Sequence, residues 1–160
     1  MPVVCFFTLN SQQMSALFCP GFGVVPAFSG KDRYVNDPGA TDVAGKGPLP
    51  VGTYYIVDRQ SGGRLGKLED ELRNLISGTR RDEWFALYRS DGVIDDYTVV
   101  NGVRRGNFRI HPVGYWGESD GCITVSNPEV FKRLRAWIRR QKTAKIPGTQ
   151  MDYYAKVVVR

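Results

Sequence analysis

The chain has 160 residues, of which 42% are hydrophobic and 24% are charged, and its formal net charge is +6 at pH 7. This length predicts one domain spanning residues 1–160, and the composition excludes a chain that is disordered throughout. The positive charge favours polyanionic partners, a group that includes nucleic acid, acidic lipid and carboxylate-rich cell wall, without choosing among them.

The expected secondary structure is mostly β. Runs of β-branched and aromatic residues are separated by Gly, Pro, Asn and Asp, which is typical of short strands joined by turns. Strands are predicted at residues 3–9, 14–19, 23–28, 53–58, 84–89, 97–100, 107–111 and 153–159, and residues 123–125 are also strand-like. Residues 30–50 form the longest irregular stretch and are a candidate border of a cleft.

Two segments have helical periodicity. The first covers residues 67–77 and is followed by Gly78, a residue type that often ends a helix. The second covers residues 128–142, where Asn127 is a favourable N-cap and Pro128 suits the first turn. Its predicted buried stripe consists of Val130, Leu134, Trp137 and Ile138. The sequence therefore predicts a mainly β (α+β) domain with two helices.

The distribution of charge argues against two kinds of partner. Basic residues concentrate in 132–142, on the predicted solvated face of the second helix, and no nucleic-acid reader motif accompanies them, so we expect no nucleic-acid partner. The first basic residue is Lys31, and polar residues 10–13 interrupt the early apolar stretches, so we expect no signal peptide. Because no uninterrupted apolar segment is long enough to span a bilayer, we expect no membrane partner.

Three cysteines leave at least one thiol unpaired within the chain. Cys5 and Cys19 flank a predicted hairpin and can face each other across it. Both a disulfide and two separate buried thiols remain open for this pair. Cys122 is the candidate for the unpaired thiol.

The most informative segment runs from His111 to Ile123 and contains the only histidine, eleven positions before Cys122. A thiolate is a strong nucleophile, and an imidazole is the usual group that takes the thiol proton. Gly121 precedes the cysteine, and a glycine there lets a substrate carbonyl approach backbone N–H groups that stabilise an oxyanion. The segment therefore predicts a catalytic cysteine on a surface loop. The competing interpretation is a buried cysteine beside a histidine whose role is structural.

This segment resembles the active-site signature of the YkuD-like L,D-transpeptidases, in which a histidine is followed by Ser-x-Gly-Cys-Ile. Residues 119–123 read SDGCI. Residues 45–59, GKGPLPVGTYYIVDR, are similar to the Pro-x-Gly-x-Tyr segment that leads into a core strand of these enzymes, and residues 85–96, FALYRSDGVIDD, also fit. The resemblance implies the YkuD-like L,D-transpeptidase fold.

Three shorter motifs are similar to a compact subfamily, the antibacterial L,D-transpeptidase effectors delivered by type VI secretion systems. These motifs are Phe28-Ser29-Gly30, Gly102-Val103-x-Arg105-Gly106 and Phe108-Arg109-x-His111-Pro112. Membership implies secretion without a signal peptide and action in the periplasm of target bacteria. It also implies two protein partners, a secretion apparatus component and a cognate immunity protein.

The resemblance further implies a reaction. Cys122, assisted by His111, attacks a peptidoglycan stem peptide between the L-centre of diaminopimelate and the terminal D-alanine, and forms a thioester. Water, a free D-amino acid or another stem then resolves the thioester, which gives L,D-carboxypeptidase activity, exchange or cross-linking. No cofactor or metal is implied. In the family a backbone carbonyl near the position of Ser119 orients the histidine.

Substrate contacts are less well defined. The usual transpeptidase has an arginine directly after Gly-Cys-Ile, whereas this chain has Thr124. Arg109 is our candidate for binding a stem carboxylate, because a guanidinium meets a carboxylate in a bidentate fork, and the alternative is a structural ion pair. Asp120 is placed with Arg109 and Thr124 in the predicted substrate-binding set, although Ser-Asp-Gly is also a turn-forming string.

Other functions remain open. An NlpC-type cysteine peptidoglycan amidase also cuts stem peptides, but there the cysteine precedes the histidine, and no histidine follows Cys122. A zinc site is disfavoured because one histidine and scattered cysteines lack clustered ligand spacing. A non-catalytic cell-wall-binding module that merely retains the motif is the remaining alternative.

Overall fold

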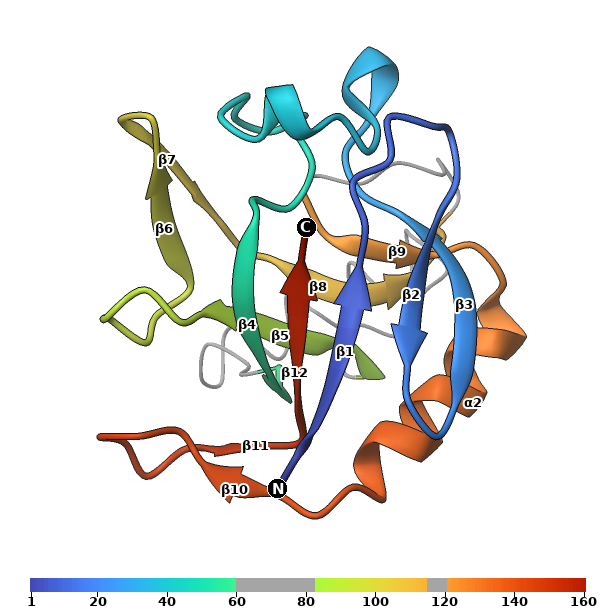
Figure 1. Ribbon diagram of the computed structural model, residues 1–160, viewed down its shortest axis with the longest axis vertical. Coiled ribbons are helices and arrows are strands. Elements are labelled where there is room, and N and C mark those ends of the chain that lie inside the picture. Colours follow the sequence, from blue (N-terminus) through green and yellow to red (C-terminus); the bar gives the residue numbers. More distant parts are fainter. Residues whose placement is uncertain (60–82, 115–120) are drawn as a thin grey trace, which may run out of the picture.

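Eight strands close into a barrel in the computed structural model, which describes residues 1–59, 83–114 and 121–160 (Figure 1). The order around the barrel is β1, β12, β4, β5, β8, β9, β3, β2. Two neighbouring pairs, β1 with β12 and β8 with β9, are parallel, and the other pairs are antiparallel. The bounds are β1 (Val3–Phe7), β2 (Ser15–Cys19), β3 (Gly23–Phe28), β4 (Gly52–Asp58), β5 (Phe85–Arg89), β8 (Arg109–Pro112), β9 (Ile123–Val125) and β12 (Ala155–Val159).

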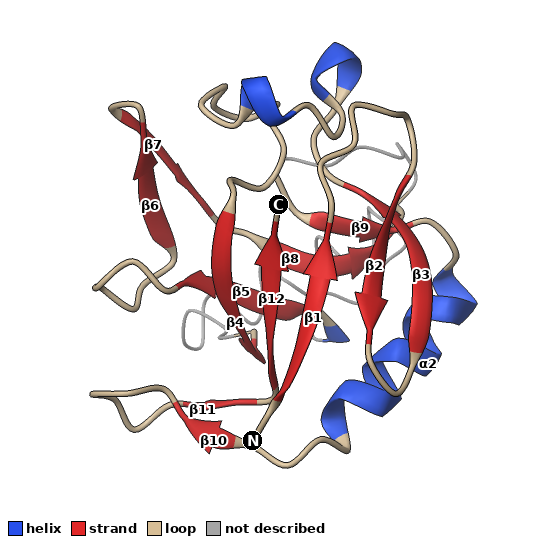
Figure 2. Ribbon diagram, viewed as in Figure 1, coloured by secondary structure: helices blue, strands red, loops and turns tan. Residues whose placement is uncertain are grey.

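Smaller elements surround the barrel. The hairpin of β6 (Tyr97–Val100) and β7 (Val103–Gly106) projects from one side, and β10 (Ala144–Lys145) pairs with β11 (Asp152–Tyr153) near the N-terminus (Figure 1). Two short 3-10 helices, η1 (Asp32–Tyr34) and η2 (Pro38–Ala40), lie in the segment between β3 and β4. The helix α2 (Pro128–Arg139) contacts β8 and β9 of the barrel, and it is drawn in blue at the lower right of Figure 2.

The core follows from the alternation of side chains along the strands. On β4, Tyr54 and Ile56 are fully buried in the main hydrophobic core. The intervening Tyr55 and Val57 belong to a second cluster, which includes Tyr153 of β11. Both faces of β4 are therefore covered, one by the barrel interior and the other by the small β10–β11 sheet.

Helix α2 closes part of the main core. Asn127 caps it as predicted, because its side chain accepts hydrogen bonds from the backbone N–H groups of Glu129 (2.9 Å) and Val130 (3.4 Å). The helix ends at Arg139 rather than at residue 142. Its buried residues are Phe131, Leu134 and Ile138, whereas Val130 and Trp137 are only partly buried against the core. No helix in the described ranges is long and apolar enough to cross a membrane.

The prediction of a mainly β chain is confirmed. Every predicted strand overlaps an observed one, although the run predicted at 153–159 is divided at Tyr154 between β11 and β12. The sequence missed β7, because Arg104-Arg105-Gly106 has no β-branched or aromatic run. Among the described residues α2 is the one α-helix, and the helix predicted at residues 67–77 lies outside them.

Candidate active site

The parallel pairing of β8 with β9 brings the predicted catalytic residues to neighbouring strands. Ile110 is opposite Ile123, and both side chains are in the core. His111 is opposite Thr124, so these two side chains are on the face that points away from the core. Cys122 lies one residue before β9. It is two positions from Thr124, so its side chain is expected on the same face as that of Thr124. Residues eleven positions apart in the sequence therefore come to neighbouring strands and to the same face of the barrel wall.

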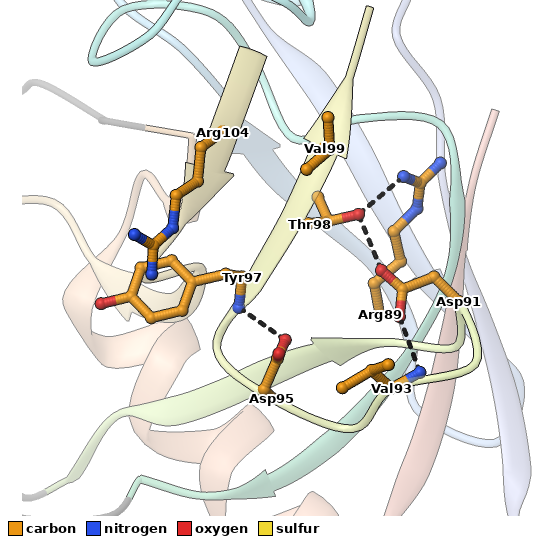
Figure 3. A pocket seen from close by; sticks show the side chains of 8 residues that line it. All are labelled: Arg89, Asp91, Val93, Asp95, Tyr97, Thr98, Val99 and Arg104. Atoms are coloured by element: carbon orange, nitrogen blue, oxygen red, sulfur yellow. Dashed lines mark hydrogen bonds between the residues drawn. The ribbon is translucent and has the colours of Figure 1, made fainter. Parts of the chain in front are cut away.

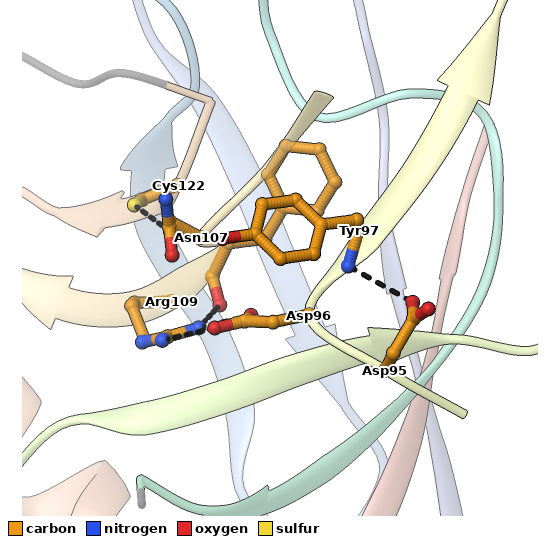
Figure 4. A network of polar contacts seen from close by, with 7 residues as sticks. Asp95, Asp96, Tyr97, Asn107, Arg109 and Cys122 are labelled. Atoms are coloured by element: carbon orange, nitrogen blue, oxygen red, sulfur yellow. Dashed lines mark hydrogen bonds and ion pairs between the residues drawn. The ribbon is translucent and has the colours of Figure 1, made fainter. Parts of the chain in front are cut away.

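Both residues of this pair are covered. His111 is 8% exposed and Cys122 is 7% exposed. The predicted surface position of Cys122 is therefore wrong, since its side chain is buried, in the bend directly before β9. The Cys122 thiol is 3.7 Å from the backbone carbonyl of Asn107, toward which it donates a weak hydrogen bond (Figure 4).

The His111 ring is held by two contacts. Its Nδ1 is 2.7 Å from the backbone carbonyl of Pro112. A carbonyl only accepts hydrogen bonds, so Nδ1 carries the proton and Nε2 is left as the basic nitrogen. Trp84 stacks on the ring, with the centroids 4.4 Å apart and the planes 25° apart. In the described residues, the orienting carbonyl thus belongs to Pro112, whereas the resemblance had implied one near Ser119, which lies outside them.

Arg109 is bound to Asp96 in a two-point contact. Both terminal guanidinium nitrogens are 2.7 Å from the carboxylate oxygens of Asp96, and one of them also donates to the carbonyl of Phe108 (Figure 4). Burial by itself lowers the pKa of Arg109, but the hydrogen bonds and charge of Asp96 outweigh it and raise the pKa above its ordinary value. Arg109 is therefore a cation whose fork already holds a carboxylate, and its predicted contact with a substrate carboxylate stays a prediction.

Gly121 is in a conformation and a space that suit glycine. Its φ is +98°, in the left-handed region. A Cβ atom built on Gly121 would lie 2.5 Å from a terminal nitrogen of Arg105 and 3.1 Å from a ring carbon of Phe108. The residue before the cysteine therefore packs directly on a buried arginine that was not among the predicted site residues. The signal for it was in the sequence, since Arg105 is a specified position of the motif Gly102-Val103-x-Arg105-Gly106, whereas the exposed Arg104 is its variable position.

The irregular stretch predicted to border a cleft does reach this site. Three of its carbonyls, those of Thr41, Gly47 and Pro48, accept hydrogen bonds from Arg105. The stretch is anchored to the barrel through Ser29, whose side chain accepts a hydrogen bond of 2.8 Å from the backbone N–H of Leu49. Residues 41–48 are thus fixed beside Gly121.

The remaining predicted site residues divide into two groups. Ser119 and Asp120 lie outside the described residues. Thr124 is fully buried on β9, and its Oγ1 makes no hydrogen bond within the described part of the chain. Contact of Thr124 with substrate therefore stays a prediction. The residues described here also contain no cluster of three or more His, Cys, Asp or Glu side chains able to hold a metal ion.

An open groove of about 420 Å³ lies against the β6–β7 hairpin (Figure 3). Thr98 is one of the residues that line the groove, and its hydroxyl donates to Asp91 (2.8 Å) and accepts from Arg89 (3.0 Å). The guanidinium of Arg104 lies over the ring of Tyr97, 3.9 Å from its centroid. Neither His111 nor Cys122 lines the groove, so the groove is separate from the two predicted catalytic residues.

Comparison with known proteins defines the class. The chain matches the family model described as the Tlde1 domain over residues 23–149, a range that includes His111, Cys122 and both elements that carry them. The chain therefore belongs to the Tlde1 domain family, a family of type VI secretion effectors. This membership indicates an enzymatic effector. No curated protein and no solved structure gave a significant match.

Proposed function

We propose that this protein is an antibacterial effector that attacks peptidoglycan stem peptides through a thioester on Cys122. The observation that carries the proposal is the placement of His111 on β8 and of Cys122 directly before the neighbouring strand β9, on the same face, with Nδ1 of His111 bonded to a carbonyl. Membership of the Tlde1 domain family supports an effector role. The likeness of residues 119–123 to the L,D-transpeptidase signature supports the substrate.

The acylation step uses the two nitrogens of His111 differently. Nδ1–H keeps the ring oriented on the Pro112 carbonyl, and Nε2 takes the proton of the Cys122 thiol. The thiolate attacks the carbonyl carbon at the L-centre of diaminopimelate, so that a C–S bond forms and a negative charge develops on the oxygen. When the C–N bond breaks, the proton on Nε2 moves to the departing amine of D-alanine.

The second step regenerates the enzyme. Water or an amine attacks the thioester carbonyl, the C–S bond breaks, and the proton lost by the attacking group returns to the cysteine through His111. Water gives L,D-carboxypeptidase activity, a D-amino acid gives exchange, and a second stem gives a cross-link. The backbone N–H groups of Gly121 and Cys122 are the candidate oxyanion donors, because Gly121, with its positive φ, makes the turn that leads into the nucleophile.

Mass spectrometry of purified tetrapeptide muropeptides incubated with the protein tests this proposal. We expect loss of the terminal D-alanine, and incorporation of a different D-amino acid when one is supplied in excess. The Cys122→Ala variant is the matched control and should leave the substrate unchanged. Cleavage within the glycan, or at an amide elsewhere in the stem, would replace the proposal with an amidase or glycosidase. Binding without any new product would favour the wall-binding module.

The site of action and the partners are part of the same proposal. As an effector of this family, the protein would be delivered by a component of the secretion apparatus and act in the periplasm of a target bacterium. A cognate immunity protein would protect the producing cell.

A further inference from the structure

Arg105 is a buried cation that packs against the turn before the nucleophile. It is 4% exposed, although arginine is rarely buried to this degree. One terminal nitrogen donates to the carbonyls of Thr41 and Pro48, the latter at 3.2 Å, and the other donates to the carbonyl of Gly47 at 2.9 Å. A single guanidinium therefore donates hydrogen bonds to three backbone carbonyls of residues 41–48.

The same guanidinium packs against Gly121. A Cβ on Gly121 would come within 2.5 Å of a terminal nitrogen of Arg105 and within 3.4 Å of the Gly47 carbonyl oxygen. The ring of Phe108 lies beside the guanidinium, 5.6 Å from the Arg105 guanidinium carbon to the ring centroid, and its nearest carbon is 3.1 Å from that Cβ position. The backbone before Cys122 thus packs against an arginine, an aromatic ring and the 41–48 segment.

We propose that Arg105 is a positioning residue that fixes the Gly121–Cys122 turn, so that its backbone N–H groups point at the oxyanion formed during acylation. This inference rests on the proposed function, since it assumes that Cys122 forms an acyl intermediate. Oxyanion donors contribute to rate only when they are already aimed at the place where charge develops. A planar guanidinium with several donors in a fixed fork holds such a turn better than a flexible ammonium does.

Two reactions of the same thiol separate positioning from nucleophilicity. Acylation by a chromogenic ester passes through a tetrahedral oxyanion, whereas alkylation by iodoacetamide is a direct displacement that forms none. We expect Arg105→Lys to lower the acylation rate of Cys122 by about tenfold or more, in the range found when an oxyanion donor is lost. The alkylation rate should stay within about twofold, because His111 and the thiol are unchanged.

Arg104→Lys is the matched control. Arg104 is the neighbouring arginine on β7, is exposed on the opposite face of the strand from Arg105, and lies over Tyr97, so both rates should be unchanged. If Arg105→Lys does not fold, Gly121→Ala serves as the second variant, because its methyl group displaces the turn from Arg105. It should give the same selective loss of acylation.

The outcomes are distinct. Equal loss of acylation and alkylation, or no loss of either, would overturn the positioning role. An absence of acylation in the wild type would also overturn it. Selective loss in Arg105→Lys supports the role even if stem peptides prove not to be the substrate, so failure of the proposed substrate is recognised separately.

Discussion

Trp84 lies nearly flat against the imidazole of His111, with the two ring centroids 4.4 Å apart. The two residues come from different places in the barrel, since Trp84 directly precedes β5 and His111 is on β8. Together with the hydrogen bond from Nδ1 to the Pro112 carbonyl, the stack limits rotation of the imidazole. Nε2 is therefore kept in one direction.

We predict that Trp84→Leu slows alkylation of Cys122 severalfold, because an imidazole that can turn spends less time facing the thiol. Trp84→Phe should keep most of the rate, since it retains a ring to stack on. Trp137→Leu is the control, because Trp137 pairs with Phe22 on the helix side of the core. Equal rates for Trp84→Leu and the wild type would show that the stack does not orient the base.

For His111→Gln we expect slower alkylation of Cys122 near neutral pH, because the thiol loses the base that takes its proton. An unassisted cysteine thiol ionises near pH 8.5, so the deficit should shrink as the pH rises above about 9. Alkylation rates measured from about pH 6 to 10 check this. Identical profiles for variant and wild type would exclude the pairing of His111 with Cys122.

Arg109 and Asp96 make a largely covered pair, with side chains 13% and 25% exposed. We expect Arg109→Lys to lower the free energy of unfolding by about 1–2 kcal/mol, because an ammonium cannot make both hydrogen bonds to Asp96. Denaturant unfolding measures this loss, and Asp96→Asn should show a similar one. A raised KM for stem peptides in Arg109→Lys, with unchanged stability, would instead support direct binding of a substrate carboxylate.

The Cys5 and Cys19 side chains are both fully buried, and the pairing of Phe6 with Phe18 extends to place them opposite each other. Both are free thiols in the structure, and their mutual hydrogen bond and burial raise the pKa of Cys19. We predict that a thiol-selective probe labels Cys122 in the folded protein and leaves Cys5 and Cys19 unmodified, because a thiol reacts as the accessible thiolate. Peptide mapping after a short exposure identifies the labelled residue. Comparable labelling of all three cysteines would contradict the difference in burial.

Expression in two compartments tests the site of action. With a signal peptide fused to it, the protein should cause swelling or lysis of growing bacteria, whereas the form kept in the cytoplasm should be harmless, because assembled peptidoglycan is out of reach there. Cys122→Ala should abolish toxicity and remain folded, since it removes only one buried sulfur atom that makes a weak hydrogen bond. Circular dichroism and immunoblotting check folding and amount. Cytoplasmic toxicity that persists in Cys122→Ala would point to an intracellular target.

Features set by neighbouring residues were predictable from the sequence. Asn127 and Pro128 define the start of α2, because an N-cap acts on backbone N–H groups two and three residues away. Most strands were placed correctly, since β-branched and aromatic runs ended by turn residues are a local signal. The catalytic candidates His111 and Cys122 were found because the segment that contains them is short and its residue types are chemically specific.

Only the tertiary structure decided which side chains meet. The motif at residues 102–106 specified Arg105 and not Arg104, but the partners of Arg105 were not predictable, because they are carbonyls of residues 41–48 that approach from about sixty positions away. From the sequence, Arg109 could bind a substrate carboxylate or form a structural ion pair. In the structure Asp96, directly before β6, is its ion-pair partner. The stack of Trp84 on His111 was also not predictable, because the two residues are far apart in the sequence. Long-range contacts of this kind depend on how strands pair around a closed barrel, which a residue pattern read along one segment does not specify.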